Sequence, residues 1–266
     1  MNIKRIYAIS LRQTYLIKDN SMRFFQMFVW VGLDVILWGI ISRYLGGAFG
    51  SGLNFIPVLL GAVLLWDFSG QVMQGVTISF FEDVWSNNFL NLFGSPLKIS
   101  EYITGLVTMG IARGIVTLMV MILLATLIFG FPVFIYGASI ALFLLILFLF
   151  GIALGIIGVS IVLRFGPSAE WLVWPIPAII APFVGVFYPH TVLPQWMQYV
   201  GRALPPSYVF TGIRDVVAGR GVSATALVGG AALAILYVAI SYMIFARVYK
   251  RAVRTGLITR YSAESL

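Results

Sequence analysis

Cysteine is absent from this sequence of 266 residues, and charged residues make up only 10% of it. Without cysteine the chain has no disulfides, thiolate zinc sites, iron–sulfur clusters or cysteine nucleophiles. Soluble domains are about 25% charged, so too few charged side chains are present to cover a surface in water. Hydrophobic residues reach 61%, and the mean hydropathy is +1.00. These values exclude a soluble enzyme, a disordered regulator and a coiled coil, and they indicate a membrane protein.

Side chains that usually carry catalysis are also scarce. The single histidine, His190, has no acidic cluster beside it, so we expect it to belong neither to a metal site nor to a Ser–His–Asp triad. None of Lys4, Lys18, Lys98 and Lys250 follows a glycine, which excludes the Gly-x-x-x-x-Gly-Lys loop that binds nucleotide phosphates. We therefore expect no enzyme activity, cofactor or metal in this chain. The net charge of +8 is not gathered on a polar domain, so nucleic acid is not an expected partner.

Long apolar stretches are what the sequence has in abundance. Each is long enough for an α-helix to cross about 30 Å of hydrocarbon, which takes about 20 residues. We predict an all-α polytopic membrane protein with an interfacial segment over residues 1–23, a transmembrane domain over 24–246 and a basic tail over 247–266. The six predicted spans are Phe24–Ser42, Phe55–Phe80, Gly105–Phe129, Ala138–Leu163, Trp171–Tyr188 and Ala224–Ala246.

Three further segments are predicted not to span the membrane. Residues 3–19 form an amphipathic helix suited to the membrane interface, because apolar and charged side chains separate onto two faces. Residues 81–104 form a loop with a second short amphipathic helix, and residues 189–223 form a long Pro- and aromatic-rich connection that is expected to re-enter the membrane. On the first helix the apolar face carries Ile3, Ile6, Tyr7 and Ile17, and the opposite face carries Arg5, Arg12 and Asp19.

Basic residues in the loops predict the orientation of the chain. Twelve lie on the side of the two termini and four on the other side, and cytoplasmic loops are the ones enriched in Lys and Arg. We therefore place both termini in the cytoplasm, in the inner (plasma) membrane. An even number of spans requires the same arrangement.

Charged residues inside the predicted spans are Asp34, Asp67 and Arg113. A charge facing lipid at this depth costs about 2.5–3.5 kcal/mol, so we expect Arg113 to pair with Asp34 or Asp67. Such a pair either holds the bundle together or forms part of a polar pathway, and the sequence leaves both open. The small-residue pairs Gly110–Gly114 and Gly151–Gly155 predict close helix packing.

Two stretches carry a resemblance to a known family. Residues 82–105 contain an acidic turn, a Leu-rich helix, Ser-Pro and Glu-Tyr-x-x-Gly. Residues 182–214 contain Pro-Phe-Val-Gly-Val-Phe-Tyr-Pro, Leu-Pro-Gln-Trp-Met-Gln and Leu-Pro-Pro-Ser-Tyr. With the order of the spans, they make nearly the whole chain resemble the permease subunit of an ABC-2 type (type V fold) ABC transporter. The segment entering span one lacks the Arg-Tyr-x-x-Ser pattern of glycan exporters, so the resemblance is to the drug- and lipid-exporting branch.

The resemblance implies an export permease that works as a dimer with a second copy or a related permease. A separate ABC ATPase would bind ATP and Mg and dock on the 81–101 loop, and spans one, two and five would line the pathway at the dimer seam. The implied coupling residues are Glu82, Asp83, Trp85, Phe89, Leu92, Phe93, Ser95 and Pro96. The implied outer signature is Pro182, Gly185, Tyr188, Pro189, Pro194, Pro205, Pro206 and Tyr208.

A different class of membrane protein is the alternative. An ATP-independent channel or ion-coupled transporter would use Asp34, Asp67 and Arg113 directly, because charges at mid-depth are typical of ion pathways. Against this class, no pair of interrupted helices forms an obvious inverted repeat.

Overall fold

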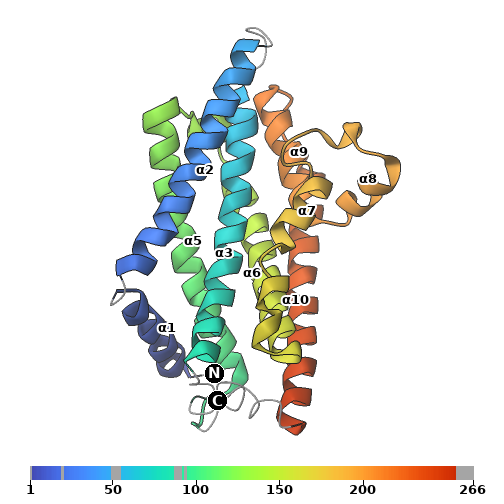
Figure 1. The fold of residues 1–266 in the computed structure, drawn as a ribbon. Coiled ribbons are helices and arrows are strands. Elements are labelled where there is room, and N and C mark those ends of the chain that lie inside the picture. The colour runs from blue at the N-terminus through green and yellow to red at the C-terminus, as the bar shows by residue number, and fades with distance from the viewer. Residues whose placement is uncertain (1, 19–20, 49–54, 87–91, 93–94, 256–266) are drawn as a thin grey trace.

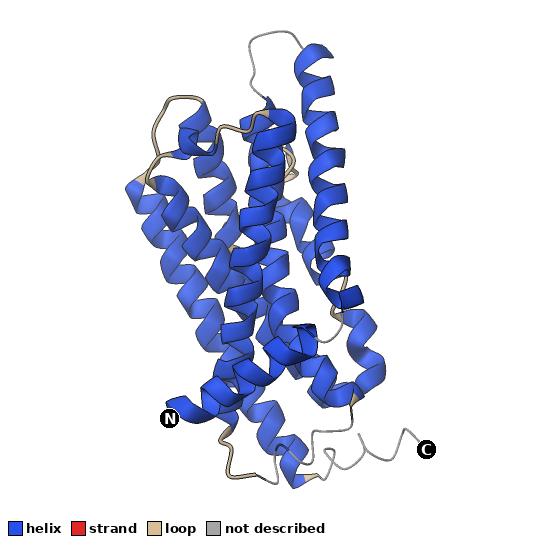
Figure 2. Ribbon diagram, turned by 90° about the vertical axis from the view of Figure 1, so that its left-hand side faces the viewer, coloured by secondary structure: helices blue, strands red, loops and turns tan. Residues whose placement is uncertain are grey.

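The computed structural model describes residues 2–18, 21–48, 55–86, 92 and 95–255. In this part of the chain the ordered elements are helices, as Figure 2 shows. Five of the helices are long and apolar enough to cross a membrane, which confirms an all-helical polytopic architecture. They are α2 (Ser21–Ala48), η1 continued by α3 (Ile56–Leu60 and Gly61–Trp85), α5 (Ile99–Phe129), α6 (Ser139–Phe165) and α10 (Ala224–Arg254).

The end of the bundle that carries α1 (Ile3–Lys18) also carries the C-terminal part of α10, at the bottom of Figure 1. We call this the lower end and the opposite one the upper end. From α2 to α6 the spanning helices alternate in direction between the two ends, whereas α10 runs in the same direction as α6; α3 lies in the middle of the bundle (Figure 1). It packs against α5 on one side and α6 on the other.

Glycines allow this close packing of α3. A Cβ on Gly75 of α3 would lie 2.5 Å from the Gly110 Cα of α5, and a Cβ on Gly151 of α6 would lie 2.5 Å from the Ser69 backbone oxygen. A real side chain has no room at such distances. The prediction that Gly110 and Gly151 mark helix contacts is therefore confirmed.

The prediction that Trp171–Tyr188 forms one continuous spanning helix was wrong. The chain there forms the 3₁₀ helix η3 (Pro167–Leu172), a turn, and α7 (Ile176–Val184), whose nine residues rise only about 14 Å. Pro175 and Pro177 lack the N–H groups that an uninterrupted helix needs, and Gly185 ends α7 in the left-handed region at φ +73°. Hydropathy alone does not register these breaks.

The connection between α3 and α5, which we call the lower turn, has fewer residues than the predicted loop over 81–104; most of the short amphipathic helix predicted within it lies outside the described residues. Helix α3 continues to Trp85, and α5 begins at Ile99, where Glu101 closes a capping box by accepting from the Lys98 backbone N–H at 3.1 Å. Only residues 86–98 connect the two helices, because both helices extend past the apolar stretches that identified them.

The N-terminal helix α1 forms where an amphipathic helix was predicted, and its place at the membrane interface stays a prediction. Its face toward the bundle carries the buried Ile9 and Gln13, and the Gln13 amide donates to the Ser79 backbone oxygen at 3.1 Å. The opposite face exposes a stripe at four-residue spacing, which suits a lipid surface. That stripe is Ile3, Tyr7, Leu11 and Tyr15.

A compact upper unit follows α7. It contains η4 (His190–Val192), α8 (Gln195–Arg202) and α9 (Pro205–Val217), which lie beside the upper halves of α6 and α10 in Figure 1. Pro205 and Pro206 occupy the first positions of α9, where their missing N–H groups cost no hydrogen bond. The η2 turn (Val133–Tyr136) joins α5 to α6 at the same end.

Candidate functional site

Asp83 lies at the centre of a buried charge cluster at the lower end. Its Oδ1 lies 2.5 Å from Arg12 Nη2 of α1, and the Tyr102 hydroxyl of α5 donates to its Oδ2 at 2.7 Å. The Asp83 side chain is fully buried. The Asp83 carboxylate is therefore already occupied by Arg12 and Tyr102 in this chain, and its contact with an ATPase stays a prediction.

Glu101 lies at the centre of a second buried charge cluster, beside the one around Asp83. Its carboxylate accepts from the Asn2 backbone N–H at 2.7 Å and pairs with Arg5 Nη1 at 3.3 Å. Arg5 Nη1 also donates to the Pro96 backbone oxygen at 2.5 Å. Two carboxylates thus fasten α1 to α3, α5 and the lower turn. We call Arg5, Arg12, Asp83, Glu101 and Tyr102 the latch.

The other predicted coupling residues are placed differently from one another. Trp85 is half exposed, and its indole N–H donates to Glu170 Oε2 at 3.0 Å. Glu82 is buried in the protein. Leu92 packs partly buried against the core, whereas Ser95 and Pro96 are exposed. Phe89 and Phe93 lie outside the described residues.

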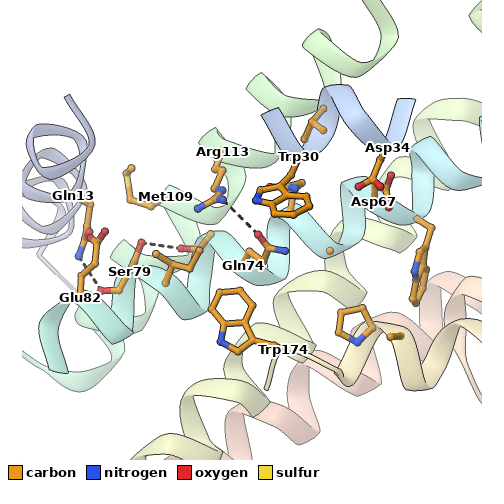
Figure 3. A pocket seen from close by; sticks show the side chains of 18 of the residues that line it. Gln13, Trp30, Asp34, Asp67, Gln74, Ser79, Glu82, Met109, Arg113 and Trp174 are labelled. Carbon is orange, nitrogen blue, oxygen red and sulfur yellow. Dashed lines mark hydrogen bonds between the residues drawn. The ribbon is translucent and has the colours of Figure 1, made fainter. Parts of the chain in front are cut away.

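A cavity of about 600 Å³ opens along α3. Side chains from α1, α2, α5 and α7 and from the turn before α7 complete its wall, as Figure 3 shows from close by. Polar groups and large aromatic rings alternate on this wall. Those that matter below are Trp30, Asp34, Asp67, Gln74, Arg113 and Trp174.

The three predicted intramembrane charges all line this cavity, but the expected ion pair is not found. Arg113 Nη2 donates to Gln74 Oε1 at 3.5 Å, and no ion pair within 4.0 Å joins it to Asp34 or Asp67 in the described part of the chain. Figure 3 shows why: the two carboxylates lie side by side, away from the guanidinium. In the described residues the expectation of pairing was wrong, because the guanidinium bonds to Gln74 of α3 instead.

The upper unit is held together by hydrogen bonds from side chains of α9 and its neighbours to backbone oxygens. Arg214 donates to the oxygens of Gly185 and Val186, the second at 3.2 Å, and the Tyr188 hydroxyl donates to the Pro182 oxygen at 2.9 Å. The predicted outer signature therefore forms a single packed unit. Pro189 and Pro194 immediately precede η4 and α8, and the Tyr208 hydroxyl donates to the Arg202 oxygen at 2.9 Å.

Burial in the upper unit disfavours the protonated forms of Arg214 and His190. Burial lowers the pKa of Arg214 to about 10, and Asp215 partly offsets this. Burial, and then the charge of Arg214, lower the pKa of His190, so its neutral imidazole is favoured. His190 packs against Gly201, where a Cβ would lie 2.6 Å from the ring. These contacts give His190 a packing role.

The sequence was compared with models of known protein families. A family model described as ABC-2 type transporter matches residues 5–218. The chain belongs to the ABC-2 type transporter family. None of the curated proteins matches the sequence. The matched range of this ABC-2 transporter chain runs from α1 to the end of α9, so it includes the latch, the cavity and the upper unit.

Several residues of the ABC-2 cavity were missed from the sequence. Gln71 and Gln74 follow Asp67 at i+4 and i+7, and Glu82 follows at i+15, so these side chains form one polar stripe along α3. That spacing was a readable signal for a polar face. Trp174 carried no comparable signal, since its position depends on the break before α7 and on Glu170 Oε1, which accepts from its indole at 3.2 Å.

Proposed function

We propose that this ABC-2 chain is the permease subunit of an ATP-driven exporter, with a pathway that passes through the cavity along α3. The observation that carries the proposal is a cavity of about 600 Å³ with charged and aromatic walls between apolar spanning helices. Polar side chains at such a depth are costly unless they serve a pathway or a partner. No nucleotide-binding loop is present in the sequence, so ATP and Mg would bind to a separate ATPase.

The lower end is proposed to face the cytoplasm, with the chain in the inner (plasma) membrane. Basic side chains concentrate there, which supports this orientation. They include Arg5, Arg12, Arg164, Arg247 and Arg251.

Residues 167–188 are proposed to form the sixth crossing, as a broken span. Helix α6 ends at the lower end and α10 begins at the upper end, so the chain between them must return (Figure 1). Broken helices are tolerated at membrane depth where they line a cavity, and α7 contributes Pro177 and Ala178 to the cavity wall.

Coupling is proposed to act through the lower turn, 86–98. A push on this turn would reach α1 through the contacts of Arg5 with Pro96 and Glu101, and α3 through Asp83. Trp85, Ser95 and Pro96 are accessible at this end. Phe89 and Phe93 stay predicted contacts of the ATPase, and Glu82 and Asp83 would act by positioning α3.

A second copy of the chain is proposed to cover the open side of the cavity between α2 and α7. Helix α2 exposes a broad apolar face there. This face is wider than the single row of side chains that would be needed to contact lipid. Its exposed large side chains include Trp30, Leu33, Ile36, Leu37 and Ile40. The drug- and lipid-exporting branch remains the proposed class.

Co-purification with an ABC ATPase tests coupling, with Trp85→Ala and Trp196→Ala as a matched pair. Both indoles are exposed, 50% and 61%, but they lie at opposite ends of the bundle. We expect Trp85→Ala to lower ATPase association at least about tenfold, since an aromatic anchor is typically worth 2 kcal/mol or more. Trp196→Ala should associate normally. Equal association of both variants would remove the lower turn from the interface.

An ATP-independent channel or ion-coupled transporter is the second candidate. The observation that favours it is that Asp34, Asp67 and Arg113 line the same cavity. Purified chain alone in vesicles distinguishes the two functions. Ion flux without any ATPase would support the channel or ion-coupled transporter, whereas transport only with ATPase and ATP supports the exporter.

A further inference from the structure

Charge in the cavity is unbalanced. Asp34, Asp67 and Glu82 contribute three carboxylates to the wall, and Arg113 contributes one guanidinium. Glu82 and Arg113 carry opposite charges and both line the part of the cavity that is nearer α1 in Figure 3. The other two carboxyl groups, those of Asp34 and Asp67, lie side by side at the far end in Figure 3.

Neither of these two aspartates has a hydrogen-bond or ion-pair partner among the described residues. In the described residues no hydrogen bond or ion pair reaches Asp34 or Asp67, in contrast to Asp83 on the same helix. Gln71 Oε1 and Arg113 Nε, which belong to residues lining the same cavity, are buried and also lack a hydrogen-bond partner. Buried polar groups are normally hydrogen-bonded, so this number of unmatched groups around one cavity indicates a ligand.

Aromatic rings line the same cavity as the two carboxylates. Trp30, Trp66 and Trp174 line the cavity. Glu170 fixes Trp174 through its indole N–H, and Trp66 packs edge-on against Phe210 at 6.1 Å between ring centroids. Indole faces attract cations, and their broad apolar area accepts the apolar part of a ligand. A hard metal ion would instead require six or more oxygen ligands.

Cavity size fits an organic molecule. Pockets that bind small organic ligands measure about 300–1,000 Å³, and this cavity measures about 600 Å³. We propose that the transported substrate is an apolar organic cation, whose charge binds between Asp34 and Asp67 and whose apolar groups pack on Trp30 and Trp174. This inference rests on the proposed transport function, but it makes a claim about binding that the chain alone can test.

Two probes of the same shape and opposite charge give the first test. Tetraphenylphosphonium is a cation and tetraphenylborate is an anion, and each has four phenyl groups around one centre. Binding to the full chain in phosphatidylcholine nanodiscs is measured by calorimetry, with binding to empty nanodiscs subtracted. We expect the cation to bind at least about tenfold more tightly. Equal binding of the two ions, tighter binding of the anion, or no saturable binding of the cation would overturn the proposal.

Isosteric variants give the second test. Asp34→Asn and Asp67→Asn remove charge but keep shape, and we expect the double variant to lose at least about tenfold in affinity for tetraphenylphosphonium. Asp215→Asn is the matched control, because Asp215 pairs with Arg220 on the surface of the upper unit, outside the cavity. Thermal unfolding checks that each variant is folded. An unchanged affinity in the folded double variant would overturn the inference.

The two proposals fail separately. If the chain binds the cation selectively but associates with no ATPase, the exporter is wrong and the cation site stands. If the ATPase associates and drives transport while both probe ions bind equally, the exporter stands and the substrate class is wrong.

Discussion

The latch and the cavity differ in whether their carboxylates are paired, although both regions include residues of α3. In the latch, Asp83 and Glu101 each have a guanidinium partner and at least one further hydrogen bond. In the cavity, Asp34 and Asp67 have no such partner in the described residues. A paired buried charge fixes structure, whereas an unpaired one facing a cavity raises the energy of the empty protein and is relieved by a ligand or a second subunit. Removing charge should therefore cost stability in the first region and function in the second.

The largest expected effect is that of Asp83→Ala. It leaves the Arg12 guanidinium and the Tyr102 hydroxyl without their shared acceptor, and breaking a buried pair costs about 3–5 kcal/mol. We expect the lower end of this range, because the Arg12 side chain keeps 27% exposure. Thermal unfolding in detergent measures the loss as a lower Tm.

The surface pair Asp215–Arg220 provides the control for this prediction. Its side chains are 30% and 67% exposed, and an exposed pair contributes about 0–1 kcal/mol, so Asp215→Ala should change Tm little. Similar Tm values for Asp83→Ala and Asp215→Ala would show that the latch does not stabilise the fold.

Tyr102→Phe is a smaller change in the same place. It removes one hydrogen bond to a charged acceptor, which is worth about 1.5–3 kcal/mol, and it leaves the Arg12–Asp83 pair intact. Tyr208→Phe is the control, since that hydroxyl donates to a neutral oxygen, the Arg202 carbonyl. We expect Tyr102→Phe to lower Tm more than Tyr208→Phe does, and the reverse order would contradict the importance assigned to Asp83.

Gly75→Ala tests the α3–α5 contact that joins the two regions. The new Cβ would meet the Gly110 Cα at 2.5 Å, and forced overpacking costs about 1–3 kcal/mol. Gly70→Ala lies on the same helix with nothing within 4 Å of its Cβ, so it should leave Tm unchanged or raise it slightly. Equal Tm values for the two variants would mean that α3 and α5 are not packed this closely.

The sequence predicted the two regions unequally well. Hydropathy located the five long helices, and spacing located α1, because both depend on patterns within one segment. The pairing partners depend on how segments meet. Arg12 was assigned to the polar face of an interfacial helix, and only the docking of α1 on α3 reveals Asp83 as its counterion.

Breaks in helices were the other source of error. Trp171–Tyr188 has the hydropathy of a span, but Pro175, Pro177 and Gly185 divide it, and the break places Trp174 in the cavity wall. The prediction that Arg113 pairs with an aspartate failed for a related reason. Depth in the membrane can be estimated from the sequence, whereas the angular position around each helix axis decides which charges meet.

Asp67→Asn is expected to have the smallest effect on stability and therefore distinguishes the two regions most directly. The substitution keeps the volume of the side chain, and it breaks no hydrogen bond or ion pair in the described part of the chain. We expect its Tm to match or slightly exceed that of the unmodified chain, because an uncompensated charge is removed from a low-dielectric site. Transport with the partner ATPase should fall in the same variant, since the proposed site loses charge. A Tm loss as large as that of Asp83→Ala would show that Asp67 is also a structural charge, and the contrast between latch and cavity would then no longer hold.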